Sequence, residues 1–207
     1  MKVKAGMIQN SPIIIGLTGG TGCGKSTVCS ILKNYSAYII DADNISHNIT
    51  KKGTKAYFEI IDSFGIDILG NKEEIDRKRL GIIVFNDKEK LSCLENITHK
   101  YIIKEINDSI KIAKDKQKYK YIVIDAPLLI ETKLHKIVDE VWIVHCSLDT
   151  RIKRLIKRDN LSEDILMKRI NNQTPFEQNK KYANFIIFNE DETNLEEIIK
   201  QRLKKEV

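Results

Sequence analysis

The chain has 207 residues, of which 42% are hydrophobic and 31% charged, and its net charge is +6. That mix is typical of one compact globular unit, and no apolar run approaches the ~20 residues that span a bilayer. Basic residues are spread among acidic ones without forming an arm or tail. We therefore expect a phosphate-bearing small molecule as ligand and neither a nucleic-acid partner nor a membrane.

The start of the chain and the cysteines bear on location. Residues 1–12 lack the apolar core of a signal peptide, and we interpret them as a loose extension of a cytoplasmic protein. The four cysteines form no C-x-x-C pair and no zinc-ligand spacing with histidine. Reduced thiols are the expected state. The sequence leaves open whether the protein is a monomer or a weak homo-oligomer.

Short apolar runs alternate with helical patterns along the chain. Strands are expected at Ile13–Leu17, Tyr38–Ile40, Tyr121–Ile124, Val141–Val144 and Phe185–Phe188. Helices are expected at Ser26–Lys33, across the charged segment Asp149–Ile170, and at Asn194–Lys204. This alternation predicts an α/β fold with a five-stranded parallel sheet covered by helices on both faces, a three-layer arrangement.

One long segment does not fit a simple crossover between neighbouring strands. From Asn44 to Lys118 the pattern is mostly helical, with apolar residues three or four apart. We expect an inserted helical domain over 49–118, with the sheet domain made of 13–48 and 119–207. Within the latter, the segment from about 150 to 180 is expected to act as a mobile lid.

The strongest motif is GGTGCGKS at Gly19–Ser26, which fits G-x-x-x-x-G-K-[ST] between a predicted strand and a predicted helix. Glycines let backbone N–H groups turn inward at a helix N-terminus and form a nest for phosphate. We expect the bound nucleotide to be ATP. The residues expected to contact it are Gly20, Thr21, Gly22, Cys23, Gly24, Lys25, Ser26 and Thr27. Lys25 is expected to bridge the β- and γ-phosphates, and the Ser26 hydroxyl to bind Mg²⁺.

Two carboxylates follow the second predicted strand and one ends the third. In an open parallel sheet, ligands lie beyond the carboxyl ends of the strands, so Asp43 can orient a hydroxyl and accept its proton. A turn or N-cap role is favoured for Asp41. Asp125 either helps to hold Mg²⁺ from outside its direct ligands or is an ordinary turn residue before Pro127.

The charged helix carries Arg151, Arg154 and Arg158. The last two are four residues apart and share a face, so they either form a lid that neutralises phosphate charge or belong to a solvated basic surface.

Taken together, these motifs resemble the dephospho-CoA kinase family from Ile14 to Asn189. The glycine turn alone is common to many P-loop NTPases, whereas DADxI and PLLxE in this order are much more specific. The matching positions are Gly16–Ser26, Asp41–Ile45, Phe64–Gly65, Ile68–Leu69, Ile75–Arg77, Leu80, Val84–Phe85, Ile97–Ile102, Pro127–Glu131, Thr150, Arg154, Arg158, Arg169 and Gln173.

The resemblance implies a P-loop kinase that transfers the ATP γ-phosphate to the ribose 3′-hydroxyl of dephospho-CoA, in the last step of coenzyme A synthesis. It implies Asp43 as base, with Lys25 and Arg154 stabilising charge. ATP would also contact Arg158 and Asn189. The residues implied to contact the acceptor are Asp43, His47, Arg77, His99 and Leu128.

Outside the glycine turn, two positions depart from the family pattern. His47 stands where the family usually has arginine, and Lys100 replaces the usual proline after His99. Both histidines have an alternative as ordinary packing or surface residues. Two other functions stay open at this stage: a nucleoside or nucleotide kinase of similar architecture, and a nucleotide-dependent switch that binds a protein or RNA. Against the switch, the chain has no guanine-reading N-K-x-D motif.

Overall fold

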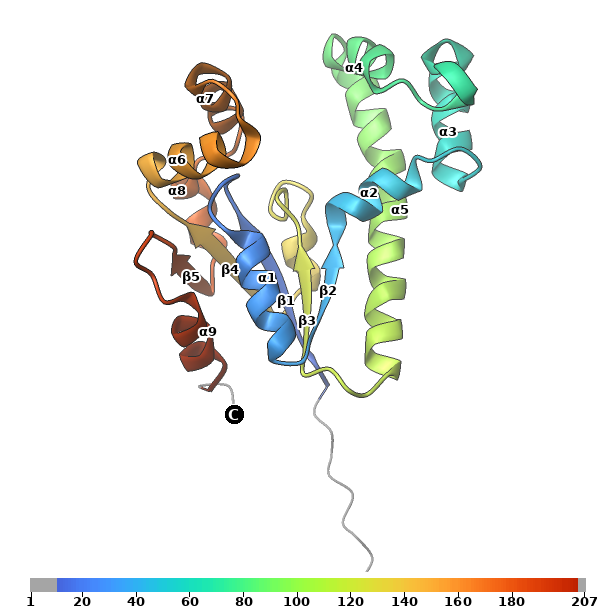
Figure 1. Ribbon diagram of the computed structural model, residues 1–207. Helices are drawn as coiled ribbons and strands as arrows, with labels where there is room; N and C mark the ends of the chain where they lie inside the picture. The colour runs from blue at the N-terminus through green and yellow to red at the C-terminus, as the bar shows by residue number, and fades with distance from the viewer. Residues whose placement is uncertain (1–10, 205–207) are drawn as a thin grey trace, which may run out of the picture. The chain divides into compact units, whose positions relative to one another are not determined.

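The computed structural model describes residues 11–204, so the predicted extension 1–12 lies outside the described residues except for its last two positions. The chain divides into two compact units (Figure 1). Among the described residues, one unit comprises 11–40 and 110–204, and the other comprises Asp41–Ser109. Both boundaries of the inserted unit lie earlier in the chain than the 49 and 118 expected from sequence.

The first unit is built on a five-stranded sheet in the order β2-β3-β1-β4-β5, which confirms the predicted sheet. The arrows in Figure 1 all point to one end of the sheet, and β1 pairs in parallel with both β3 and β4. The strands are β1 (Ile13–Gly19), β2 (Ala37–Asp41), β3 (Tyr121–Asp125), β4 (Glu140–His145) and β5 (Phe185–Phe188).

The register brings the predicted site residues to one edge. Leu17 of β1 lies opposite Asp125 of β3, and Gly19 lies opposite Val144 of β4. The loop that follows β1 and the carboxylate that ends β3 therefore meet at the carboxyl edge of the sheet, where open α/β sheets bind ligands.

Two helices cover one face of this sheet, α1 (Lys25–Asn34) and α9 (Leu195–Lys204). Their apolar sides share a buried cluster with the strands, in which Trp142 is fully buried. The segment between β3 and β4, which includes η3 (Leu134–Ile137), packs against the opposite face of β1. Gly16 is needed there, because a Cβ at this position would lie 2.7 Å from Leu129 Cδ2.

The predicted charged helix after β4 is two helices, so that expectation was wrong. The first, α6 (Leu148–Asp159), ends at Asn160, which has left-handed φ of 52° and ψ of 38°. The second, α7 (Glu163–Asn171), begins after Ser162. Asparagine tolerates this left-handed geometry and so ends α6 in the way a glycine would. The short α8 (Phe176–Asn179) and η4 (Lys180–Tyr182) complete the connection to β5.

The inserted unit is helical, and its helices start at short polar caps. Asp41, Thr54 and Asp76 each accept a hydrogen bond from a backbone N–H of the following turn. The N-cap role expected for Asp41 is thereby confirmed. A buried cluster around Ile60 and Ile97 joins the helices. The elements are α2 (Ala42–Ile49), α3 (Lys55–Phe64), η1 (Ile66–Ile68), η2 (Asn71–Glu73), α4 (Arg77–Phe85) and α5 (Lys88–Asp115), the last of which continues into the sheet unit.

Across residues 11–204, no helix combines the length and the apolar character that crossing a membrane requires.

Candidate active site

The loop after β1 depends on glycine at two positions where it passes close to other backbone or side-chain atoms. Gly19 has a φ of +151°, and a Cβ there would lie 2.3 Å from the carbonyl oxygen of Val144. Gly24 has a φ of +96° and caps α1, and a Cβ there would lie 2.3 Å from Asn189 Nδ2. Any larger residue at either position would have to displace its neighbour.

This loop presents unpaired backbone donors. The N–H groups of Gly22, Gly24, Lys25 and Ser26 have no hydrogen-bond acceptor within residues 11–204. Three of them belong to the cap and first turn of α1, where helical N–H groups lack an intrahelical partner and the helix dipole favours negative charge. The loop can therefore bind a chain of phosphates through its backbone.

The loop borders a cavity of about 330 Å³ that brings most of the predicted nucleotide residues together. Lys25 extends along it, and its Nζ lies 3.4 Å from the carbonyl oxygen of Gly19, its acceptor. A phosphate entering the cavity would offer this ammonium a stronger, charged acceptor than a carbonyl. The lining residues are Gly20, Thr21, Gly22, Gly24, Lys25, Ser26, Asp125, Arg154, Leu155 and Arg158.

The two predicted arginines of α6 reach this cavity, and each is also held by a carboxylate. Arg154 donates to the carbonyl oxygen of Asn189 and to Asp191 Oδ1, both at 3.0 Å. Arg158 makes a two-pronged contact with the carboxylate of its neighbour Asp159, which lowers the pKa of that carboxyl group. Since Asp191 is largely exposed, its attraction for Arg154 is screened by water, and a triphosphate could compete for the guanidinium.

Ser26 and Asp125 line the same cavity, as expected for a magnesium site. Hydroxyl and carboxylate oxygens suit Mg²⁺, which usually takes only one or two protein ligands besides phosphate and water. Within residues 11–204 no group of three or more His, Cys, Asp or Glu side chains could cage a metal. Asp125 also accepts from Cys29 Sγ at 3.6 Å, and burial beside this carboxylate raises the pKa of the Cys29 thiol to about 12.

Two of the predicted nucleotide residues, Asn189 and Cys23, do not line this cavity and are bonded to each other. Asn189 is buried, and its Nδ2 donates to the carbonyl oxygen of Cys23 at 2.8 Å. The Cys23 side chain is buried beside Cys146, which donates hydrogen bonds to it. Those bonds, with a contribution from nearby Arg151, lower the pKa of the Cys23 thiol. Thr27, the last loop residue in the prediction, is exposed in the first turn of α1 and does not line the cavity.

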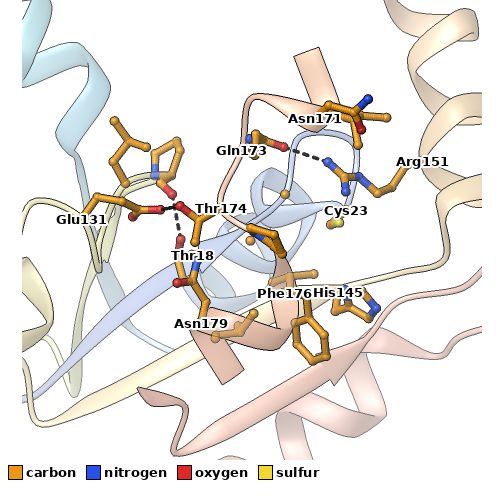
Figure 2. Close-up of a pocket in the computed structure, with 18 residues that line it drawn as sticks. Thr18, Cys23, Glu131, His145, Arg151, Asn171, Gln173, Thr174, Phe176 and Asn179 are labelled. Atoms are coloured by element: carbon orange, nitrogen blue, oxygen red, sulfur yellow. Dashed lines mark hydrogen bonds between the residues drawn. The ribbon is translucent and has the colours of Figure 1, made fainter. Parts of the chain in front are cut away.

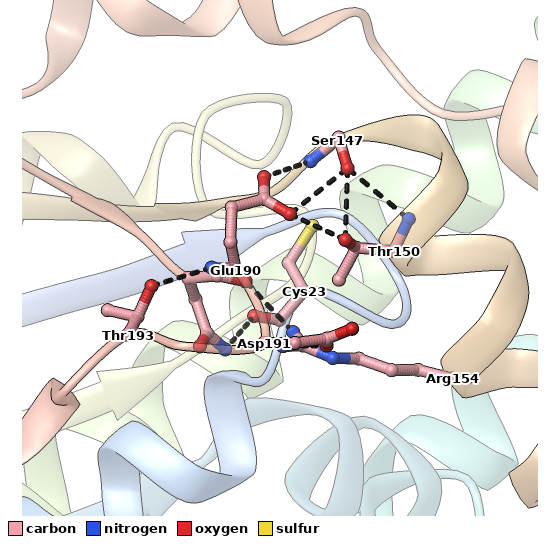
Figure 3. Close-up of polar contacts among 8 residues, drawn as sticks. Cys23, Ser147, Thr150, Arg154, Glu190, Asp191 and Thr193 are labelled. Atoms are coloured by element: carbon pink, nitrogen blue, oxygen red, sulfur yellow. Dashed lines mark hydrogen bonds and ion pairs between the residues drawn. The ribbon is translucent and has the colours of Figure 1, made fainter.

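A carboxylate that the sequence analysis missed holds the start of α6. Glu190 accepts from the N–H of Ser147 at 2.6 Å and from the hydroxyls of Ser147 and Thr150, as Figure 3 shows. The Thr150 hydroxyl is the largest cause of the lowered pKa of Glu190. A negative charge at a helix N-terminus stabilises it, so this contact fixes the base of the helix that carries Arg154.

A second cavity, of about 270 Å³, lies beside the start of the loop (Figure 2). Leu128, a predicted acceptor contact, lines it together with Glu131, whose carboxylate accepts from the Thr174 hydroxyl at 2.5 Å. His145 stacks on Phe176 with ring centroids 3.9 Å apart, and burial lowers its pKa. The contact between Glu131 and Thr174 ties the PLLxE segment to the end of the lid segment.

The other predicted acceptor residues lie in the inserted unit. Asp43 is exposed in the first turn of α2. His47 lies in the last turn of the same helix, and its Nδ1 lies 2.6 Å from Arg77 Nη2. His47 and Arg77 line a cavity of about 500 Å³ whose lining also includes Lys51 and several apolar side chains. His99 is half-buried on α5 and does not line this cavity.

Comparison with known proteins decides the family. The family model described as dephospho-CoA kinase matches residues 13–195. The chain belongs to the dephospho-CoA kinase family.

Individual members of the dephospho-CoA kinase family agree with this assignment, and a more distant kinase shares the fold. The dephospho-CoA kinase of Carboxydothermus hydrogenoformans is 44% identical over 85% of both chains. A solved dephospho-CoA kinase from Campylobacter jejuni superposes with a TM-score of 0.66 at 30% identity, covering 94% of this chain and 98% of that one. A shikimate kinase from Acinetobacter baumannii, in complex with shikimate, has a TM-score of 0.54 at 12% identity over 95% and 93% of the chains, and so shares the fold alone.

Proposed function

We propose that this chain transfers the γ-phosphate of ATP to the ribose 3′-hydroxyl of dephospho-CoA, giving CoA and ADP. The observation that carries the proposal is the cavity that combines unpaired loop N–H groups with Lys25 and Arg154, in a chain that matches the dephospho-CoA kinase family over residues 13–195. Phosphoryl transfer needs mainly positioning and charge stabilisation, and this set of groups supplies both.

In this proposal the loop N–H groups and Lys25 hold the β- and γ-phosphates. Arg154 and Arg158 stand on the same face of α6 and line the same cavity, so they are suited to stabilise the negative charge that spreads over the transferred group. Thr27, at the exposed start of α1, is left to contact the α-phosphate side of the nucleotide. Asn189 and Cys23 act by supporting the loop.

Ser26 and Asp125 are the groups that would hold Mg²⁺, directly or through water. When bound, the metal neutralises charge between the β- and γ-phosphates and helps to orient them. The donor set fits such an ion, since a hydroxyl and a carboxylate share the cavity with the phosphate nest.

We assign Asp43 the role of the base that orients the 3′-hydroxyl and accepts its proton. Its place in the first turn of α2 is fixed by the Asp41 cap, whose Oδ1 accepts from Asn44 N at 2.9 Å. His47 and Arg77 form a paired polar group in a cavity with basic walls, which suits the anionic part of the acceptor. We also assign Leu128, a residue of the sheet unit, to contact with dephospho-CoA. Closure of the lid segment would exclude water, which could otherwise take the phosphate.

An acceptor panel tests the proposed reaction. ADP release is measured with ATP and Mg²⁺ in the presence of dephospho-CoA, of nucleosides, of nucleoside monophosphates, or of no acceptor. We expect release above background only with dephospho-CoA. Faster ADP release with a nucleoside or nucleotide would show that the chain is a nucleoside or nucleotide kinase instead. Equal ADP release without any acceptor would reject the transfer reaction.

The base role of Asp43 has a matched control two residues away. Asp43→Asn should lower kcat by about 10²–10⁴-fold with little change in ATP binding, because the proton acceptor is lost. Asp41→Asn changes the charge equally but keeps a good N-cap, so it should retain near-normal turnover. Undiminished turnover in Asp43→Asn would remove this residue from the mechanism.

A further inference from the structure

The backbone of Thr21, at the tip of the phosphate-binding loop, is held on both sides by side chains from the lid segment. Its N–H donates to Gln173 Oε1 at 3.0 Å, and its carbonyl oxygen accepts from Arg151 Nε at 3.0 Å. Arg151 Nη2 in turn donates to Gln173 Oε1 at 2.7 Å (Figure 2). Each of the three residues therefore bonds the other two, and loss of either side chain opens the ring.

Arg151 also lies flat against the loop. A Cβ on Gly20 would lie 2.8 Å from Arg151 Nη2 and 2.9 Å from its Cζ, so the guanidinium occupies the space that a glycine leaves. No ion pair joins Arg151 to a carboxylate within residues 11–204. The two nitrogens that donate, Nε and Nη2, each bond a neutral oxygen, so these contacts position the guanidinium and do not pair it with a negative charge.

The three arginines of α6 differ in what they face. Arg154 and Arg158 follow Arg151 by three and seven positions, so the three side chains lie on one stripe of the helix. Arg154 and Arg158 line the phosphate cavity, whereas Arg151 is bonded to the loop that forms its wall. The bonds from Arg151 hold the start of α6 against the loop, and the position of this start sets the directions of the two arginines that follow.

We propose that Arg151 and Gln173 are positioning residues for phosphoryl transfer. By holding the Thr21 peptide they fix the loop tip against α6, so that Arg154 and Arg158 point at the γ-phosphate. This inference rests on the proposed function. The residues that meet the remaining phosphates, from Gly24 to Ser26, lie outside the ring, so ATP binding should depend on it much less than turnover does.

The first test uses Arg151→Met and Gln173→Met, which keep an unbranched, flexible side chain and remove the hydrogen bonds. In steady-state assays with ATP and dephospho-CoA, each should lower kcat by about tenfold or more with a change in the KM for ATP below about threefold, because small misplacement of charge is costly in the transition state. Lys153→Met is the matched control, since it removes a cation from the exposed side of the same helix and should behave as wild type.

The kcat of the double variant shows whether Arg151 and Gln173 act together or independently. If the three residues act as one unit, Arg151→Met with Gln173→Met should be no more than about threefold slower than the slower single variant. A merely stabilising role predicts lower unfolding midpoints with normal kcat in the folded protein, and it would overturn the proposal. Multiplied losses in the double variant would overturn it as well.

Hydrogen exchange of the Thr21 amide tests the ring without any substrate. The Thr21 amide should exchange with solvent at least about tenfold faster in both methionine variants than in wild type, because its acceptor is gone or displaced. Gln173→Glu keeps the accepting oxygen and should restore slow exchange. If Thr21 exchange is unchanged in Gln173→Met, the ring does not exist. If the wild-type chain forms no CoA, the proposed function is refuted. The exchange rate of the Thr21 amide would still show whether the hydrogen-bonded ring exists.

Discussion

Replacement of Gly24 by alanine tests the geometry of the phosphate-binding loop. Gly24 has a φ of +96°, where an L-residue costs about 1–2 kcal/mol. The new methyl group would also lie 2.3 Å from Asn189 Nδ2, which donates to the buried carbonyl oxygen of Cys23. Displacing that amide leaves a buried donor and acceptor unpaired, at a cost of about 1–3 kcal/mol. We therefore expect Gly24→Ala to lose about 2–5 kcal/mol of unfolding free energy in total.

Gly53→Ala is the matched control for backbone strain. Gly53 has a φ of +88°, and a Cβ there would meet no atom within 4 Å. Only the conformational cost applies, so we expect a loss of about 1–2 kcal/mol. The difference between the two variants isolates the close approach between Gly24 and Asn189.

The assay is urea unfolding followed by far-UV circular dichroism, with fluorescence of the single Trp142 as a second probe of the sheet, and ATP binding by calorimetry. Gly24→Ala should bind ATP at least about tenfold more weakly, which corresponds to about 1.4 kcal/mol, while Gly53→Ala binds normally. Adding Asn189→Ala to Gly24→Ala should cost less than the sum of the single changes, because the contact is relieved. Equal stability losses for the two glycines, or normal ATP binding by Gly24→Ala, would refute the reasoning.

Three further predictions concern charge. Lys25→Met should lower kcat by about 10²–10³-fold in steady-state assays, through lost stabilisation of transition-state charge; a change below threefold would contradict that role. The raised pKa of Cys29 means that folding favours its neutral thiol. The free energy of unfolding should therefore be constant below pH 9 and fall toward pH 12 by up to about 1.4 kcal/mol per pH unit. Urea midpoints measured across this range should show the fall in wild type and not in Cys29→Ala. The lowered pKa of Glu190 makes its contribution present above pH 4.5 and lost as pH falls below it. The melting temperature of Glu190→Gln should therefore decline less steeply in acid than that of wild type, and parallel curves would count against the contact.

Local patterns predicted the sheet and the phosphate-binding loop. Each strand is an apolar run rich in β-branched residues, and the glycines of the loop stand between a strand and a helix. The break between α6 and α7 was missed because charged residues continue across it. The sequence nevertheless carries a signal for this break. Asparagine, at position 160, accepts left-handed backbone geometry, and serine, at position 162, is a common helix N-cap.

The supports of the loop could not be predicted, because they join residues far apart in sequence. The contact between Asn189 and Cys23 spans 166 positions, and that between Gln173 and Thr21 spans 152. Sequence reasoning assigned Asn189 to the nucleotide and did not foresee that its buried amide donates to the loop carbonyl of Cys23. A buried polar residue must find a partner, but nothing local indicates which one it finds.

The most direct test of the account follows the phosphate itself. The chain is incubated with Mg²⁺, dephospho-CoA and ATP labelled in the γ-phosphate, and the product is analysed by mass and by phosphorus NMR. We predict one labelled phosphate per molecule of acceptor, attached to the ribose 3′-oxygen, with one ADP formed for each. Label released as free phosphate, or attached to any other oxygen, would contradict the account.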